Sequence, residues 1–258
     1  MSIQKAKAII LRSRKQGETS KILTMYSQEF GKMALMAKGS RGVKSKYLGT
    51  LETFNHVSLI FYRKEQRQMQ YLSQASIIDS FSSLHNELGK LSLAAILCEI
   101  VDKSEDTEHA NAALFQLLLD GLQAIDQNAR GLRNIVRAFQ IKFISHSGFE
   151  PELAHCHFCK KQEPTEQNYF SLEHGMYSCA ACGFLKNGVL LNDHAIQVLR
   201  WFYETPIARA AEANVSKATG ELLDTFLNDY LQYHIEPLYA LKSVQHLKTL
   251  QSKFSNSM

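Results

Sequence analysis

The chain has 258 residues, of which 45% are hydrophobic and 21% are charged, with thirteen Gly and four Pro. This composition is typical of a soluble globular protein of one to three domains, and it excludes collagen-like and low-complexity chains. No apolar run approaches the roughly 18 residues of a membrane helix, and the amino terminus lacks the small-residue cleavage site of a signal peptide. We therefore expect a cytoplasmic protein.

The net charge of +4 is unevenly distributed along the chain. Residues 1–80 contain fourteen Lys and Arg against five Asp and Glu, an excess of +9, whereas residues 81–258 carry −5. A basic module of this size favours a polyanionic partner, most often a nucleic acid.

The basic module has the period-two hydrophobic pattern of short strands. In the third of these segments, for example, Met33, Leu35 and Ala37 share one face. The expected strands cover residues 5–11, 21–26, 32–38, 54–62 and 68–77. Five strands in about eighty residues suit a small closed barrel such as an OB-fold, and an SH3-like barrel fits the pattern nearly as well.

From about residue 84 the hydrophobic period becomes helical. Helices are expected over residues 84–101, 110–125, 132–146, 195–203, 221–235 and 239–250, with Asn192-Asp193 as an N-cap. Residues 151–190 interrupt this pattern and contain four cysteines. We therefore expect an α+β multidomain protein in which helices on either side of the cysteine region pack together. The predicted domains are an OB-fold barrel (1–80), a helical domain in two parts (81–150 and 191–258) and a cysteine-rich insertion (151–190).

The insertion has the spacing of a zinc site. Cys156 and Cys159 form one Cys-x-x-Cys pair, and Cys179 and Cys182 form a second pair after nineteen intervening residues. Four thiolates would close a tetrahedral shell around one structural Zn²⁺, with no open position for catalysis. Redox activity is the competing interpretation. The nearby histidines (His155, His157 and His174) are expected to be exposed turn residues, and Cys98 is expected to be a small buried hydrophobe.

The loop after the third strand is rich in cations and glycine. Lys38, Arg41, Lys44 and Lys46 lie within nine residues, with two glycines between them. Glycine allows close approach to a phosphate chain and Lys and Arg neutralise it, while Tyr47 offers a ring for base stacking. We predict a nucleic-acid contact here, and a solvated loop is the alternative.

The helix from residue 132 carries a basic stripe beside apolar positions. Arg133 and Arg137 lie next to Phe139 and Phe143 at helical spacing. A cation beside an apolar slot would suit an acidic peptide with a hydrophobic tip, whereas an ordinary solvated helix face is the competing interpretation.

Motifs of common enzymes are missing from the sequence. There is no P-loop, no H-E-x-x-H, no G-x-S-x-G and no zinc-deaminase signature. We therefore expect a protein that is not an enzyme. Two other classes stay open: a zinc-ribbon enzyme that modifies nucleic acid, acting on RNA, and a purely structural interaction module.

Several short strings, taken with the order of the domains, resemble the RecO family of bacterial recombination mediators over nearly the whole chain. They are Gly17–Ile22 (GETSKI), Glu29–Lys32 (EFGK), Met36–Arg41 (MAKGSR), Gly148–Leu153 (GFEPEL) and Leu241–Ser243 (LKS). The resemblance implies an N-terminal OB-fold and a non-enzymatic DNA-repair factor of the cytoplasm that acts at the nucleoid.

The resemblance also implies activities, partners and sites. Such proteins bind single- and double-stranded DNA, anneal complementary strands, and act with RecR, and in many bacteria RecF, to load RecA onto strands coated by single-strand-binding protein. Lys38 and Arg41 match the family's basic exit from the third strand, and Lys44 and Lys46 continue that charge. The four cysteines match the zinc-bearing members, since some members lack them. Arg133 and Arg137 lie where the family's helical domain meets the acidic C-terminal tail of single-strand-binding protein, and Phe139 is the apolar residue beside them that we predict to join this site.

Overall fold

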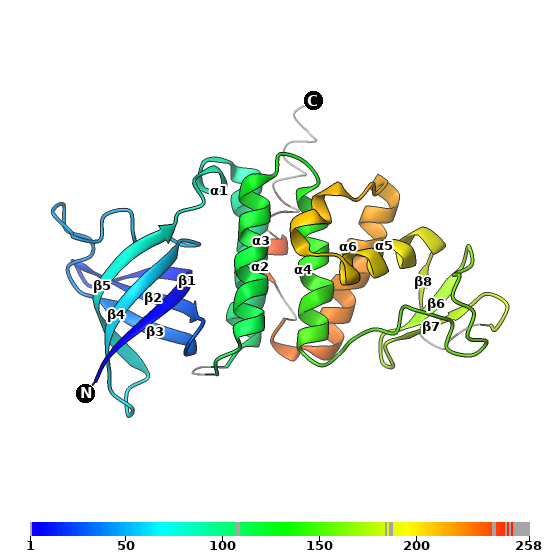
Figure 1. Ribbon diagram of the computed structural model, residues 1–258, viewed down its shortest axis with the longest axis horizontal. Helices are drawn as coiled ribbons and strands as arrows, with labels where there is room; N and C mark the ends of the chain where they lie inside the picture. Colours follow the sequence, from blue (N-terminus) through cyan, green and yellow to red (C-terminus); the bar gives the residue numbers. More distant parts are fainter. Residues whose placement is uncertain are drawn as a thin grey trace. The chain divides into compact units, whose positions relative to one another are not determined.

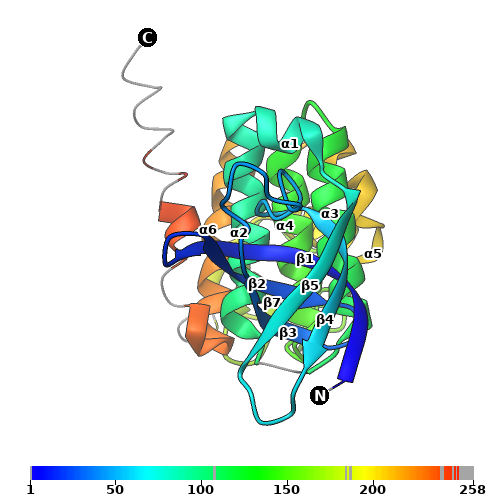
Figure 2. The same ribbon diagram turned by 90° about the vertical axis from the view of Figure 1, so that its left-hand side faces the viewer.

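The computed structural model describes residues 2–106, 109–183, 185, 188–238, 241–245, 247 and 249. It begins with five strands, β1 (Ser2–Gln16), β2 (Ser20–Ser27), β3 (Gly31–Ala37), β4 (His56–Arg63) and β5 (Met69–Asp79) (Figure 1). They close into a barrel in the order β1-β2-β3-β5-β4, with β3 and β5 parallel and the other pairs antiparallel. The predicted five-stranded barrel is confirmed, and its connectivity is OB-like (Figure 2).

The barrel core follows the period-two pattern of the strands. Met33, Leu35 and Ala37 point inward from β3 and are buried, as predicted. On β5 the inward residues are Leu72 and, unexpectedly for a polar side chain, Gln70. The turn before β5 satisfies the Gln70 amide, which receives the N–H of Lys64 and donates to the carbonyls of Lys64 and Arg67.

Helices α1 (Ser82–Asn86), α2 (Leu88–Ser104) and α3 (Ala112–Gln127) follow the barrel. Helix α2 contacts strands β1 and β2. Ile9 and Tyr26, which pair across these two strands on the outside of the barrel, have no exposed surface. The Tyr26 hydroxyl donates to the Glu105 carboxylate just after α2, at 3.2 Å. Burial and the neighbouring Glu105 carboxylate raise the pKa of Tyr26, so the phenol stays protonated.

The cysteine-rich region is a three-stranded sheet between helices. Strands β6 (Asn168–Ser171), β7 (Met176–Cys179) and β8 (Val189–Leu191) pair in the order β7-β6-β8. Helix α4 (Leu132–His146) precedes them; α5 (Asp193–Glu204), the 3-10 helix η1 (Ile207–Glu212), α6 (Lys217–His234) and the 3-10 helix η2 (Glu236–Leu238) follow. The Asn192 side chain caps α5 by accepting from Ala195 N–H, as predicted. Helix α4 packs against α5 and α6, so the prediction that helices on either side of the insertion pack together is confirmed.

The chain divides into two compact units, Met1–Asp126 with Leu241–Met258, and Gln127–Ala240. Helices α1 and α2 thus belong to the unit that contains the barrel. The domain boundaries expected from the sequence stay a prediction. Residues 242–245 are helical, and most of the remaining expected C-terminal helix lies outside the described residues. Within the described residues, none of the helices combines the length and the apolar character that crossing a membrane requires.

Candidate nucleic-acid interface and four-cysteine centre

A β-bulge in β1 determines which way two arginines face. The first half of β1 pairs with β4 and the second half with β2, and in the second ladder Ile10 and Arg12 pair with consecutive residues of β2. Leu11 is therefore an extra residue. Because side chains alternate between the two faces of a strand, this insertion places Arg12 and Arg14 on the outside of the barrel instead of in its core.

The outer face reached by these arginines is hollowed. The register brings Arg12 beside Thr24 of β2, which pairs with Ala34 of β3, which pairs in turn with Met69 of β5. The hollow has a volume of about 510 Å³. Three cations and several apolar residues are among those that line it: Arg12, Ser13, Arg14, Ile22, Thr24, Lys32, Met33, Ala34, Gln68 and Met69.

An aromatic ring with two cations lies one register step along the same face. Tyr71 of β5 pairs with Met36 of β3 and is half-buried. The Lys38 ammonium lies 4.8 Å from the centre of the Tyr71 ring, and the Arg67 guanidinium lies 5.4 Å from it. The surface around Tyr71 therefore combines positive charge with a partly exposed π-system.

Residues of the loop 38–47 form hydrogen bonds to neighbouring parts of the barrel, which a freely solvated loop would not do. Arg41 donates from its backbone N–H to Thr19 and from its guanidinium to the Gly17 carbonyl, at 2.9 and 2.8 Å. The Lys46 ammonium donates to the Ser73 carbonyl at 2.6 Å. The four predicted cations are all exposed: Lys38, Arg41, Lys44 and Lys46.

The prediction that Tyr47 offers a stacking ring is wrong. Tyr47 is 4% exposed and belongs to the barrel core, and its hydroxyl donates to the Ser73 carbonyl at 2.8 Å. Tyr71, on the outside of β5, is partly exposed instead. The period-two pattern of β5 places Tyr71 on the same face as Met69, which is the signal that could have identified it. The bulge that turns Arg12 and Arg14 outward has no such signal.

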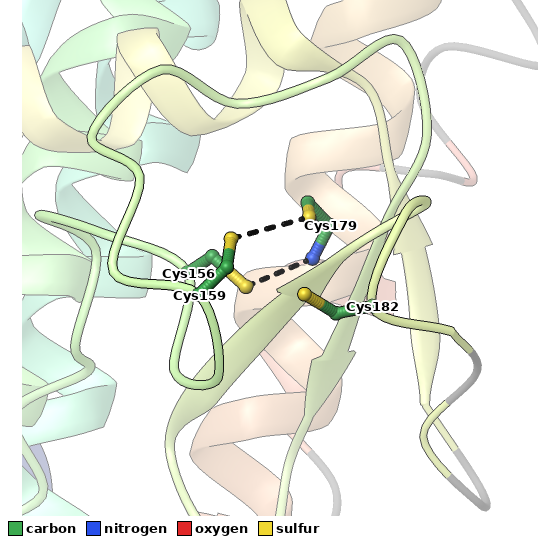
Figure 3. Close-up of side chains that lie close together, drawn as sticks. All are labelled: Cys156, Cys159, Cys179 and Cys182. Carbon is green, nitrogen blue, oxygen red and sulfur yellow. Dashed lines mark hydrogen bonds between the residues drawn. The ribbon is translucent and has the colours of Figure 1, made fainter.

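The four predicted metal ligands lie together (Figure 3). Cys156 and Cys159 come from the loop before β6, Cys179 ends β7 and Cys182 follows it. Each pair closes a tight turn, with Lys160 N–H donating to the Cys156 carbonyl and Cys182 N–H to the Cys179 carbonyl, both at 3.0 Å. Local hydrogen bonds thus point the two thiols of each pair in one direction.

The geometry fits a tetrahedral ion. All four Sγ atoms lie within 4.8 Å of one another, and those of Cys159 and Cys179 are 3.7 Å apart. A tetrahedron with metal–sulfur bonds near 2.3 Å has sulfur–sulfur edges of about 3.8 Å. No histidine joins this cluster within the parts of the chain that are described. Cys98 is buried, as expected, and burial raises the pKa of its thiol, which keeps it protonated.

The environment of Cys156 favours a thiolate. Burial raises the pKa of this thiol, but N–H groups of Cys179, Cys159 and Phe158 that face its sulfur outweigh burial, and the pKa falls to about 6. Since a thiolate is the metal-binding form of cysteine, these donors prepare a ligand.

Helix α5 holds the segment that carries the first cysteine pair. Arg200 of α5 donates to the carbonyls of Leu153, Ala154 and Gln162 and to the Tyr177 hydroxyl. One guanidinium therefore ties residues before and after the first pair, and a residue of β7, to a helix. The segment around the first cysteine pair is thus held against α5 by hydrogen bonds that do not depend on a metal ion.

The arginine stripe of α4 faces another helix. Arg137 is 6% exposed and donates to Asp224 of α6 at 2.7 Å, to the Asn134 side chain at 2.7 Å and to the Gly220 carbonyl at 3.0 Å. Gly220 leaves room for the guanidinium, because a Cβ there would lie 2.7 Å from its Nη2 atom. Arg133, whose side chain is 44% exposed, binds the other oxygen of Asp224.

The apolar slot expected beside this stripe is not open. Phe139 and Phe143 stack on each other with ring centres 6.1 Å apart, and both are fully buried. Of the three residues predicted to bind an acidic tail, Arg133 is accessible, whereas Arg137 and Phe139 are part of the interior. Helical spacing correctly predicted that Phe139 lies near the arginines on α4. It did not predict that α5 and α6 pack against α4 and that Phe139 is buried.

Comparison with known proteins assigns the chain to a family. Residues 1–81 match the family model "Recombination protein O N terminal", and residues 85–244 match "Recombination protein O C terminal". The chain belongs to the RecO family. RecO proteins are non-enzymatic mediators of recombinational DNA repair, so the alternative of a nucleic-acid-modifying enzyme is set aside.

Individual RecO proteins align with nearly the whole chain. The "DNA repair protein RecO" of Desulfatibacillum aliphaticivorans is 29% identical over 253 residues, which cover 95% of this chain and 96% of that protein. The protein of the same name from Pelotomaculum thermopropionicum is 30% identical and covers 92% of this chain and 91% of its own length. That of Thermoanaerobacter sp. is 25% identical, with 98% and 100% covered.

The buried ion pair of α4 yields a stability prediction. Arg137→Ala leaves the Asn134 side chain and the Gly220 carbonyl without this partner and leaves Asp224 with only Arg133, and each buried polar group left unpaired costs about 1–3 kcal/mol of the free energy of unfolding. Arg133→Ala removes the exposed arm of the same carboxylate and should cost about 0.2–1 kcal/mol. Urea denaturation of both variants measures the difference. Equal, small decreases would contradict the structural role assigned to Arg137.

Proposed function

We propose that this RecO-family chain binds single- and double-stranded DNA through one outer face of its barrel and anneals complementary strands. The observation that carries the proposal is the gathering of Arg12, Arg14, Lys38 and Tyr71 on the outside of β1, β3 and β5, around the hollow described above. The loop 38–47 extends this charge with Arg41, Lys44 and Lys46.

The chemistry of this face suits annealing. Two complementary strands repel each other through their phosphates, so a protein that brings them together must neutralise backbone charge. It must also leave the base edges free, because those edges have to find their partners. Guanidinium and ammonium groups bind phosphates irrespective of sequence, and a tyrosine ring stacks on any base. The hollow offers these groups together with an apolar surface.

The proposal predicts a specific decrease in DNA affinity. The variant Arg14→Ala/Lys38→Ala should bind a labelled oligothymidine more weakly, and the slope of log K against log salt should fall by about 0.7 for each phosphate that is no longer neutralised. Lys5→Ala/Lys7→Ala is the matched control, since it removes the same charge from the half of β1 that pairs with β4. Fluorescence anisotropy over a salt series provides the measurement.

Equal decreases in the two double variants would mean that the barrel attracts DNA only through its net charge, and the assigned face would be wrong. Strand annealing should follow the same order as binding, without added nucleotide. The variant Lys38→Ala/Arg41→Ala tests the loop in the same way. If this variant kept the wild-type affinity and salt slope, the loop would have no role in DNA binding.

The position of the chain in repair rests on the family. We infer that it acts with RecR, and with RecF where that protein is present, to load RecA on DNA coated by single-strand-binding protein. A surface that holds single strands is what such a step requires, because the coated strand has to be handed to another protein. DNA, RecR and single-strand-binding protein are therefore the direct partners that we propose.

The acidic C-terminal tail of single-strand-binding protein is proposed to bind near Arg133, Arg137 and Phe139. Arg133 supplies the accessible cation, and its planar fork can hold a terminal carboxylate through two charge-assisted hydrogen bonds. Arg137 and Phe139 support α4 from inside.

The tail-binding site has its own test. Arg133→Ala should weaken binding of a tail peptide by at least about tenfold, because each of the two charge-assisted hydrogen bonds that it removes contributes about 1.5 kcal/mol. Arg14→Ala/Lys38→Ala should leave peptide affinity unchanged. Peptide titration by anisotropy at two salt concentrations distinguishes the two surfaces. If the barrel variant no longer binds the peptide and Arg133→Ala still does, the tail binds the barrel.

The four-cysteine cluster is proposed to hold one structural Zn²⁺. Cys156, Cys159, Cys179 and Cys182 would be its ligands, and the ion would supply folding free energy to the sheet of β6–β8. Four thiolates leave no coordination position for a substrate, so no reaction is assigned to this metal.

Metal analysis tests the zinc proposal. Purified protein should contain about one zinc per chain, and Cys156→Ser should lower the metal content and the thermal stability while a well-folded barrel keeps its DNA affinity. Cys98→Ser, a change at a buried cysteine outside the cluster, should retain the zinc. Metal-free protein prepared without chelators, with stability equal to that of the variant, would overturn the assignment.

A further inference from the structure

We propose that Asp102 is a built-in competitor of DNA phosphate at the barrel face. This inference rests on the proposed DNA-binding function and concerns the regulation of that same site. Arg12 and Lys32, two of the cations that line the hollow, both contact the carboxylate of this one residue.

The interaction between Asp102 and Arg12 is a two-point ion pair. The Nε atom of Arg12 lies 2.8 Å from Oδ2 of Asp102, and its Nη2 atom lies 3.4 Å from Oδ1. The Arg12 side chain is 69% exposed, whereas that of Asp102 is only 14% exposed. The arginine is therefore accessible to a ligand, but one edge of its guanidinium is already occupied by an anion of the protein.

Lys32 contacts both the side chain and the backbone of Asp102. Its ammonium lies 3.9 Å from Oδ1 of Asp102 and donates to the Asp102 backbone carbonyl at 2.5 Å. Asp102 lies in the last turn of α2, where backbone carbonyls have no partner within the helix. Lys32 thus caps α2 from the barrel, in agreement with the preference of helix C-termini for cations. The pair with Asp102 links the hollow to this helix.

Arg14 provides the contrast. It lies two residues after Arg12 on the same outer face, and it has no ion-pair partner among the residues that the structure describes. A phosphate that approaches Arg14 meets an available guanidinium. A phosphate that approaches Arg12 either displaces the Asp102 carboxylate or shares the guanidinium with it, and the two anions then repel each other. In both cases the carboxylate lowers the affinity for DNA.

The test is Asp102→Asn in the full chain, with a labelled oligothymidine as the probe. The change keeps the size of the side chain and the carbonyl that Lys32 caps, but it removes the competing charge. Affinity at low salt should rise about two- to fivefold, the range of one partly exposed charge pair. The slope of log K against log salt should steepen by up to about 0.7, because one more phosphate is neutralised.

Glu52→Gln is the matched control. Glu52 forms a 3.1 Å ion pair with Lys21 on the same barrel, and neither residue lines the hollow. This change adds the same net charge and also releases a cation, so an equal gain in affinity would mean that only total charge matters and would overturn the proposal. Unchanged or weaker binding by Asp102→Asn would overturn it as well, because the carboxylate would then have no effect on DNA affinity or would position Arg12 for DNA.

One further measurement keeps the proposal testable if Asp102→Asn does not fold. Arg14→Ala should weaken binding more than Arg12→Ala, because Arg12 is already engaged; the reverse order would contradict the proposal. Where Asp102→Asn folds, its gain in affinity should disappear in an Arg12→Ala background, and a gain that persists there would contradict the proposal. A wild-type protein that fails to bind oligothymidine at all would instead refute the proposed function.

Discussion

The single extra residue at Leu11 is the constraint on which the arrangement of the barrel face depends. If Leu11 paired regularly with Thr24 instead of forming a bulge, Arg12 would pair with Leu23 and point into a core of aliphatic side chains. Burial of an unpaired guanidinium in such a core is prohibitively costly, so the strand would have to slip or break. With the bulge, the first half of β1 supplies core residues while Arg12 and Arg14 of its second half stay on the surface, and β1 can close the barrel on both sides.

The bulge also separates two regions of the outer surface. Before it, Ile9 is covered where α2 contacts β1 and β2, and the Tyr26–Glu105 hydrogen bond joins the strands to the end of that helix. After it, Arg12 and Arg14 border an open hollow. Asp102 lies at the junction, where it binds cations of the barrel from the last turn of α2. The same helix therefore completes the fold on one side and determines the charge balance of the hollow on the other.

Local patterns in the sequence predicted the features that depend on local residues. Period-two alternation identified all five strands and the inward face of β3, the capping residue identified the start of α5, and cysteine spacing identified the four sulfurs that lie together. These features depend on neighbours within a few residues, or on a pair of short motifs whose spacing is itself the signal.

The features that were missed depend on residues distant in the sequence. From the sequence, Arg137 belongs to a basic stripe on the surface of a helix, but in the structure it is buried against Asp224, which lies 87 residues later. From the sequence, Tyr47 was expected to be exposed, but its ring is buried and its hydroxyl donates to the Ser73 carbonyl. The hollow itself requires the register of four strands, including the parallel pairing of β3 with β5 that no alternation pattern specifies. Physical chemistry explains each of these interactions, but the sequence alone does not say which residues will meet.

The central claim is that single-stranded DNA lies on the outer face formed by the second half of β1, β2, β3 and β5. Photocrosslinking of the full chain to a bromouracil-substituted oligonucleotide, followed by mass spectrometry of the crosslinked peptides, tests it most directly. We expect crosslinks in peptides that contain Tyr71 and in those from residues 12–16 and 32–47. Crosslinks confined to residues 127–240 would contradict it.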